Sequence, residues 1–153
     1  YGLGKLLPRR RSHKMSDAGE LLLDTCTIIF GANGTALNPS AVTAIETAID
    51  EGRVRISPVS AWELGMLMSR NRIASTSEPL DFFNQALTRT LAKICELTPE
   101  ILVSSCYLPG VIHRDPMDRI LIATARAHDL TLVTSDRAIL DYGAAGHVKT
   151  LEC

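Results

Sequence analysis

The chain has 153 residues, 46% of them hydrophobic, and a formal net charge of −1 at neutral pH. This length suits one domain with a single core. No apolar run approaches the roughly 20 residues of a membrane-spanning helix, so we expect no membrane association. The four cysteines are scattered without a CxxC pair, which predicts a reduced, cytoplasmic protein with neither disulfides nor a zinc site.

Positive charge is concentrated at the N-terminus. The first 14 residues hold five Lys or Arg and no acid, whereas the remainder holds 11 basic and 17 acidic residues. Residues 1–20 lack periodicity and mix Gly, Pro and clustered Arg, so we predict a disordered basic extension followed by one domain over 21–153. Met15 is a candidate native start, and we expect the residues before it to lie outside the folded domain. Because the domain is acidic, a nucleic-acid substrate would need cations between carboxylates and phosphates.

The first predicted strand covers residues 21–23 and ends in Asp24. A short apolar run that ends in an acid is typical of a buried parallel strand with a carboxylate at its tip. Residues 31–34 are predicted to form a loop, and a helix is expected to start at Asn38-Pro39 and end before Gly52.

Further strands are predicted over residues 54–56, 94–97, 130–133 and 147–151, with helices between them. Ser57-Pro58, Thr98-Pro99 and Asp115-Pro116 mark helix starts after strands, because an N-cap side chain followed by proline suits the first turn. Another helix is expected after Pro79 and a short one around residues 139–142. This alternation predicts a parallel sheet with helices on both faces.

Glu63 is an unusual residue in the helix predicted after Pro58. Val59, Trp62, Met66 and Leu67 are expected on the same side as Glu63. Burying an unpaired carboxylate costs several kcal/mol or forces protonation, so Glu63 is expected to face a polar pocket where a metal ion balances its charge. The alternative is that Glu63 lies at the solvent-exposed edge of the apolar face of this helix.

Residues 113–136 contain two more candidate acids. Asp118 falls in the first turn of the helix that Asp115 caps, on the face of Leu121 and Ile122. Asp136 follows the next strand, at the sheet edge where open α/β proteins bind ligands. Asp115 is interpreted as a cap or a minor contributor.

Together these acids form a candidate metal site. Clustered carboxylates repel one another, and a divalent cation relieves the repulsion; oxygen ligands favour Mg²⁺ or Mn²⁺ over zinc. Such a site can hydrolyse phosphodiesters. Thr25, Thr134 and Ser135 lie beside the acids and either orient them or simply end their strands.

Four motifs, in this order, resemble those of the PIN-domain ribonucleases, and closely those of the VapC toxins of toxin–antitoxin pairs. They are LLLDT at 21–25, SAWELG at 60–65, HRDPMDRILIATA at 113–125 and LTLVTSD at 130–136. The resemblance implies a PIN-like three-layer α/β/α sandwich around a mainly parallel, roughly five-stranded sheet. It maps the family's acid quartet onto Asp24, Glu63, Asp118 and Asp136, and its last-strand hydroxyl onto Thr134.

The resemblance also implies a function. The expected activity is a Mg²⁺-dependent endoribonuclease, usually a homodimer, which cleaves RNA involved in translation and is held inactive by a cognate antitoxin. Arg114, Arg119 and Arg137 flank the acids and are candidate RNA-binding residues.

Four alternatives remain open at this point. The first is a PIN-type nuclease in RNA processing without an antitoxin. An aspartyl phosphotransferase of the dehalogenase type would want a second Asp where Cys26 stands, and a receiver domain would want paired acids and a lysine earlier than Lys149. The last is a PIN-like fold that has become an inert binding module, which the presence of all four acids disfavours.

Overall fold

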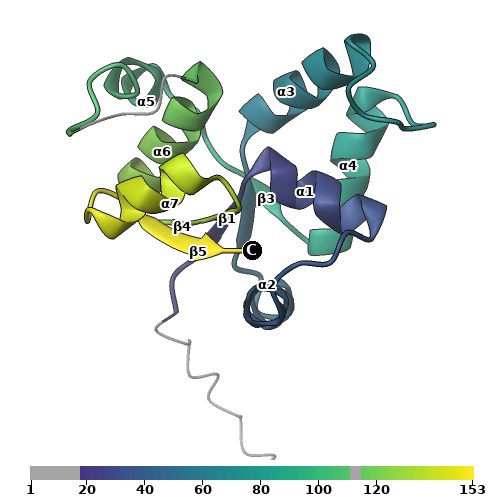
Figure 1. The fold of residues 1–153 in the computed structure, drawn as a ribbon, viewed down its shortest axis with the longest axis horizontal. Coiled ribbons are helices and arrows are strands. Elements are labelled where there is room, and N and C mark those ends of the chain that lie inside the picture. The colour runs from purple at the N-terminus through teal and green to yellow at the C-terminus, as the bar shows by residue number, and fades with distance from the viewer. Residues whose placement is uncertain (1–17, 111–114) are drawn as a thin grey trace, which may run out of the picture.

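A five-stranded parallel sheet forms the centre of the molecule (Figure 1). The computed structural model describes residues 18–110 and 115–153. The strand order is β3-β2-β1-β4-β5, so β1 and β4 are central neighbours, with Leu23 opposite Val133. The strands are β1 (Leu21–Leu23), β2 (Val54–Ile56), β3 (Lys93–Ile94), β4 (Thr131–Thr134) and β5 (Lys149–Glu152).

Helices cover both faces of this sheet. They are α1 (Thr25–Asn33), α2 (Pro39–Asp50), α3 (Pro58–Ser69), α4 (Pro79–Thr90), α5 (Pro99–Ser104), α6 (Pro116–His128) and α7 (Arg137–Ala144). Figure 1 shows α5, α6 and α7 on one side and α1 to α4 on the other. The sheet has a hydrophobic core on each face, and alternate residues of β1 contribute to the two cores. Leu22 packs with α6 and α7, whereas Leu21 and Leu23 pack with α1, α2 and α4. The predicted three-layer α/β/α sandwich is confirmed.

The predicted helix starts are also confirmed. Asn38, Ser57, Thr98 and Asp115 each accept a hydrogen bond from a backbone N–H of the helix that follows, and each helix has Pro in its first turn. These caps satisfy donors that a helix otherwise leaves without a partner, so local sequence fixes where α2, α3, α5 and α6 begin.

Three local predictions were wrong. The predicted loop at 31–34 is largely helix, because α1 continues to Asn33 and ends at Gly34, whose φ of 68° suits glycine. The strand predicted over 94–97 is shortened to Lys93–Ile94, an exposed edge strand. Trp62 is 59% exposed, and Leu64 is fully buried instead. The apolar side chains of α3 itself are distributed around nearly the whole helix. Their spacing therefore could not define which face points inward.

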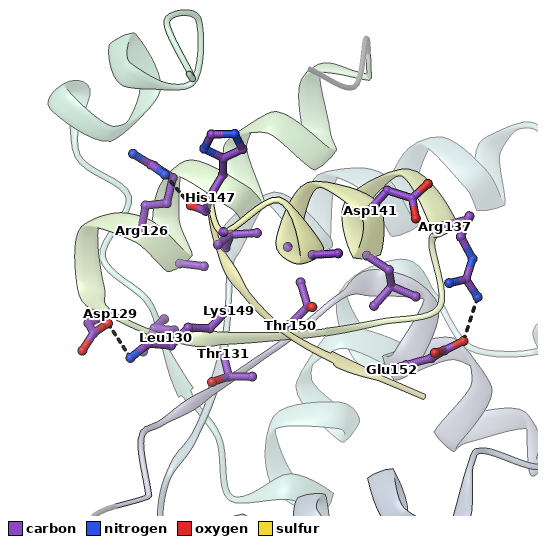
Figure 2. A pocket seen from close by; sticks show the side chains of 16 residues that line it. Arg126, Asp129, Leu130, Thr131, Arg137, Asp141, His147, Lys149, Thr150 and Glu152 are labelled. Atoms are coloured by element: carbon purple, nitrogen blue, oxygen red, sulfur yellow. Dashed lines mark hydrogen bonds and ion pairs between the residues drawn. The ribbon is translucent and has the colours of Figure 1, made fainter. Parts of the chain in front are cut away.

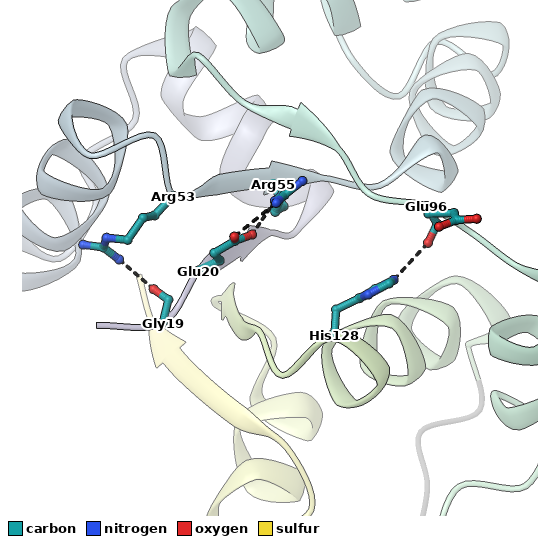
Figure 3. A network of polar contacts seen from close by, with 6 residues as sticks. All are labelled: Gly19, Glu20, Arg53, Arg55, Glu96 and His128. Carbon is teal, nitrogen blue, oxygen red and sulfur yellow. Dashed lines mark hydrogen bonds and ion pairs between the residues drawn. The ribbon is translucent and has the colours of Figure 1, made fainter. Parts of the chain in front are cut away.

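The two residues just before β1 contact the segment around β2. Gly19 accepts a hydrogen bond from Arg53 at 2.6 Å, and Glu20 forms an ion pair with Arg55 (Figure 3). Gly19 and Glu20 therefore contact the residues of the neighbouring strand segment, and residues 1–17 lie outside the described part of the chain. Within the described ranges, no helix has the length and apolar character needed to cross a bilayer.

Strand β5 forms one edge of the sheet, and surface ion pairs surround it. A hollow of about 960 Å³ lies between β5, α6 and α7 (Figure 2). Lys149 pairs with Asp129 at 2.8 Å and Arg137 pairs with Glu152 at 2.9 Å. None of the four predicted acids lines this hollow, so the candidate chemistry lies elsewhere.

Candidate active site at the carboxyl edge of the sheet

Asp24 is the most buried of the four acids, with 3% of its surface exposed. It follows β1 directly, and its backbone N–H donates to the Val133 carbonyl of β4 at 3.0 Å. Its side chain caps α1, where Oδ1 accepts from the Cys26 N–H at 3.4 Å. Burial raises the pKa of Asp24, and the hydrogen bond from Thr134 opposes this effect.

Thr134 connects Asp24 to Asp136. Its buried hydroxyl donates to Asp24 Oδ2 at 2.6 Å and accepts from the Asp136 N–H at 3.0 Å. The Asp136 side chain in turn caps α7 by accepting from the Ile139 N–H at 3.1 Å. The negative charge of Asp136 is one of the effects that raise the pKa of Asp24, so the two carboxylates are electrostatic neighbours.

Glu63 projects from α3 toward the same edge. Burial raises its pKa, the polar side chain of Thr25 nearby lowers it, and the charge of Asp24 raises it further. Its Oε2 atom is buried and has no hydrogen-bond partner in the described part of the protein. Because a buried carboxylate oxygen without a partner is costly, Glu63 has the property expected of a cation ligand.

Asp118 lies in the first turn of α6, next to the capping residue Asp115. The Asp115 side chain accepts from the N–H groups of Met117 at 2.8 Å and Asp118 at 3.4 Å, as its predicted capping role requires. Burial raises the pKa of Asp118 to about 8, and the charges of Asp24, Asp115, Asp136 and Glu63 contribute in that order. Asp118 therefore experiences the other three predicted acids together with Asp115.

Cys26, which the sequence did not mark as part of the site, is an electrostatic neighbour of all four acids. Loss of hydration, and then the charges of Asp24, Glu63, Asp118 and Asp136, raise the pKa of its thiol to about 12. The thiol is thus held in its neutral form at physiological pH. Because the charges of all four acids raise the pKa of this one thiol, the four acids share one region.

The acids share this region without forming a closed ligand cage. Across residues 18–110 and 115–153, no three His, Cys, Asp or Glu side chains are grouped closely enough to hold an ion together. Neighbouring carboxylates repel, so they separate unless a cation draws them together. Donor chemistry nevertheless fits a hard divalent cation, since the groups are carboxylate oxygens and one of them, Glu63 Oε2, lacks a partner.

The other predicted residues lie in different environments. Thr25 is fully buried, and its hydroxyl lies 2.9 Å from the hydroxyl of Ser60, a residue that sequence reasoning missed. Apolar spacing could not mark a small polar residue on the inward face of α3. Ser135 is exposed.

The predicted RNA-binding arginines differ among themselves. Arg114 lies outside the described residues. Arg119 donates to the carbonyls of Ser105 at 2.8 Å and Cys106 at 3.0 Å, which holds the end of α5. Arg137 forms its ion pair with Glu152 at the surface (Figure 2).

Comparison with known proteins agrees with this arrangement. The PIN domain family model matches residues 21–145. Ribonuclease VapC22 of Mycobacterium tuberculosis (strain ATCC 25618 / H37Rv) is 31% identical over 110 residues, which are 72% of this chain and 81% of that protein.

Two solved structures share the fold. One is the crystal structure of VapBC2 from Rickettsia felis bound to a DNA fragment from their promoter, with a TM-score of 0.62 and 15% identity over 86% of this chain and 97% of that chain. The other is a domain of a functionally unknown protein from Methanocaldococcus jannaschii DSM 2661, with a TM-score of 0.52 and 18% identity over 89% and 91%.

The chain belongs to the PIN-domain family. Its identity to Ribonuclease VapC22 confirms the predicted resemblance to VapC-type members, while the structural similarities support the fold. The aspartyl phosphotransferase and receiver-domain alternatives are therefore excluded.

Proposed function

We propose that this protein is a Mg²⁺-dependent endoribonuclease, with Mn²⁺ as a substitute ion, that acts as the toxin of a toxin–antitoxin pair. The observation that carries the proposal is the shared field of Asp24, Glu63, Asp118 and Asp136 at one sheet edge. The sequence similarity to a VapC ribonuclease supports the same activity.

Each acid has a distinct role in the proposed site. Asp24 and Asp136 are the rigid pair, because Thr134 fixes both. Glu63 and Asp118 complete the set from α3 and α6, and these four residues would hold the ion. A bound divalent cation supplies charge neutralisation at the scissile phosphate and lowers the pKa of an attacking water.

The RNA backbone would be bound by arginine side chains near the acids. Arg137 suits this role, because its ion pair with Glu152 is exposed and such pairs contribute little to stability, so a phosphate can replace Glu152. Arg119 is already held by two carbonyl groups and is better suited to stabilising α5. Arg114 remains a candidate on the basis of its position in the sequence. We expect Arg137→Gln to weaken RNA binding and Arg119→Gln to lower stability.

The proposed partners follow from the family resemblance. The solved structure of VapBC2 from Rickettsia felis contains a complex of that type bound to DNA, which supports a cognate antitoxin for this chain. We also propose a homodimer that works in the cytoplasm. Expressing the chain with and without the product of the neighbouring reading frame tests the toxin role: growth should stop only when the neighbour is absent.

Cleavage of RNA by the purified chain tests the enzymatic role. Asp118→Asn should lower the Mg²⁺-dependent cleavage rate by about 100-fold or more, the range seen when a group that acts in the transition state is removed. Asp141→Asn is the matched control, because Asp141 is exposed on α7 and lines the hollow beside β5. Full cleavage by Asp118→Asn, or cleavage by the unmodified protein in excess chelator, would refute the proposal.

A further inference from the structure

The carboxylate of Asp24 is held by groups from two different elements. Thr134, the last residue of β4, donates to Oδ2 at 2.6 Å, and the Cys26 N–H in the first turn of α1 donates to Oδ1 at 3.4 Å. Both bonds can form at once only if α1 and β4 keep a fixed separation. The orientation of the Asp24 carboxylate therefore depends on the contacts that fix the start of α1 against β4.

Thr27 provides a side-chain contact from α1 to β4. Its hydroxyl is buried and donates to the Val133 carbonyl at 3.1 Å. The same carbonyl accepts from the Asp24 N–H at 3.0 Å. A backbone carbonyl has two lone pairs and can accept both bonds. One oxygen atom of β4 thus anchors both the backbone of Asp24 and the first turn of α1.

A second contact fixes the direction of the Thr27 proton. The Sγ atom of Cys153, the residue after β5, lies 3.3 Å from Thr27 Oγ1, and the Cys153 N–H donates to the Thr134 carbonyl at 3.2 Å. Because a hydroxyl has a single proton and Thr27 donates it to Val133, the thiol is the donor in its contact with Thr27. The hydroxyl of Thr27 therefore donates on one side and accepts on the other.

We propose that Thr27 is a positioning residue for Asp24: its bond to Val133 holds the first turn of α1 at a fixed distance from β4, so that the Asp24 carboxylate keeps one orientation toward a bound cation. In this role Thr27 does not touch the ion. The inference rests on the proposed function, because it requires Asp24 to bind the ion.

Isothermal titration of the purified full chain with Mn²⁺, without RNA, tests this role. Thr27→Val keeps the shape but removes the hydroxyl, and it should weaken Mn²⁺ binding about three- to tenfold, the effect expected for one lost hydrogen bond. Thr27→Ser keeps the hydroxyl and should bind like the unmodified protein. Thr27→Cys differs from the serine variant mainly in its weaker donor, so its loss should be intermediate, and it replaces the valine variant if that protein does not fold.

Thr124→Val is the matched control. Thr124 is a fully buried threonine of α6, and its hydroxyl also donates to a backbone carbonyl, that of Ile120 at 2.7 Å. This bond lies within one helix and does not join two elements. The same substitution therefore removes a buried hydroxyl without changing the separation of α1 and β4, and it should leave Mn²⁺ binding unchanged.

Two results would overturn the role of Thr27. One is Mn²⁺ binding by Thr27→Val, or by Thr27→Cys in its place, that equals binding by the unmodified protein. The other is an equal loss of binding in Thr124→Val, because the loss would then follow from any missing buried hydroxyl. Failure of the proposed function has a different signature, namely that Asp24→Asn binds Mn²⁺ as tightly as the unmodified protein.

Discussion

Thr134 shows how a single residue organises the site. It is fully buried and hydrogen-bonds with both Asp24 and Asp136, which come from different ends of the sequence. A hydroxyl can donate and accept at once, so one side chain satisfies a carboxylate and a backbone N–H. The site depends on this dual capacity rather than on charge alone.

Replacing Thr134 by Val removes both bonds with almost no change in shape. The Asp24 carboxylate and the Asp136 N–H would lose a partner, so we expect the free energy of unfolding at pH 7 to fall by about 1–3 kcal/mol. Thr134→Ser retains the hydroxyl and should lose much less. Urea denaturation of the three proteins measures the difference, and equal midpoints for Val and Ser would contradict the bridging role.

The raised pKa of Asp118 predicts that its charge destabilises the folded protein in a pH-dependent way. Its pKa is about 8 in the folded protein against 3.8 for the ordinary side chain, so the folded state binds the proton more tightly. In metal-free protein, the contribution of Asp118 to stability should be fully present below its ordinary pKa of 3.8 and should be lost as pH rises toward 8.

Asp118→Asn removes this cost and should melt higher than the unmodified protein at pH 7.5 in chelator. Each kcal/mol regained corresponds to a rise of about 2–4 °C in a domain of this size. The two melting curves should converge well below pH 3.8, where Asp118 is protonated in both the folded and the unfolded protein. A variant that melts at the same or a lower temperature at pH 7.5 would show that the folded state does not disfavour this charge.

At the level of elements, close packing of α7 against β5 depends on Gly143. A Cβ atom at this position would lie 2.6 Å from Thr150 Oγ1 and 2.7 Å from its Cγ2. The contact brings the helix that follows Asp136 close to the edge strand. Any larger side chain would push α7 outward and displace the cap formed by Asp136.

Gly143→Ala should therefore destabilise the protein by about 1–3 kcal/mol, as overpacking generally does. Gly65→Ala is the matched control, because Gly65 is also helical and a Cβ there would meet nothing within 4 Å. That substitution should stabilise α3 by up to about 1 kcal/mol. Thermal unfolding distinguishes the two, and equal effects would show that α7 can move away from β5.

At the level of the whole molecule, the parallel sheet places distant acids at one edge. Asp24 follows β1 and Asp136 follows β4, and these strands are direct neighbours in the sheet. The carboxyl ends of parallel strands meet at the same edge, so the folded chain concentrates negative charge there. A ligand that relieves this charge should stabilise the folded state.

Mg²⁺ should raise the melting temperature of the unmodified protein in a concentration-dependent way. An ion that binds only the folded state adds about 2.7 kcal/mol at a concentration 100 times its Kd. Asp24→Asn should lose most of this response, whereas the exposed control Asp141→Asn should keep it. An equal Mg²⁺ response in all three proteins would indicate that the ion binds elsewhere.

Local sequence determined much of this protein. The caps at Asn38, Ser57, Thr98 and Asp115 fix helix starts through contacts within three residues, so the sequence alone located them. The run that ends in Asp24, and the alternation of strands and helices, predicted the fold class for the same reason. The order of the motifs identified the family.

Tertiary structure decided the rest, because those contacts join residues far apart in the chain. The hydroxyl of Thr134 reaches Asp24 across 110 positions, and Thr25 meets Ser60 across 35. The orientation of α3, with Trp62 outward and Ser60 inward, follows from packing against α4, α6 and α1 rather than from apolar spacing. Such contacts depend on strand order and helix rotation, which no short stretch of sequence specifies.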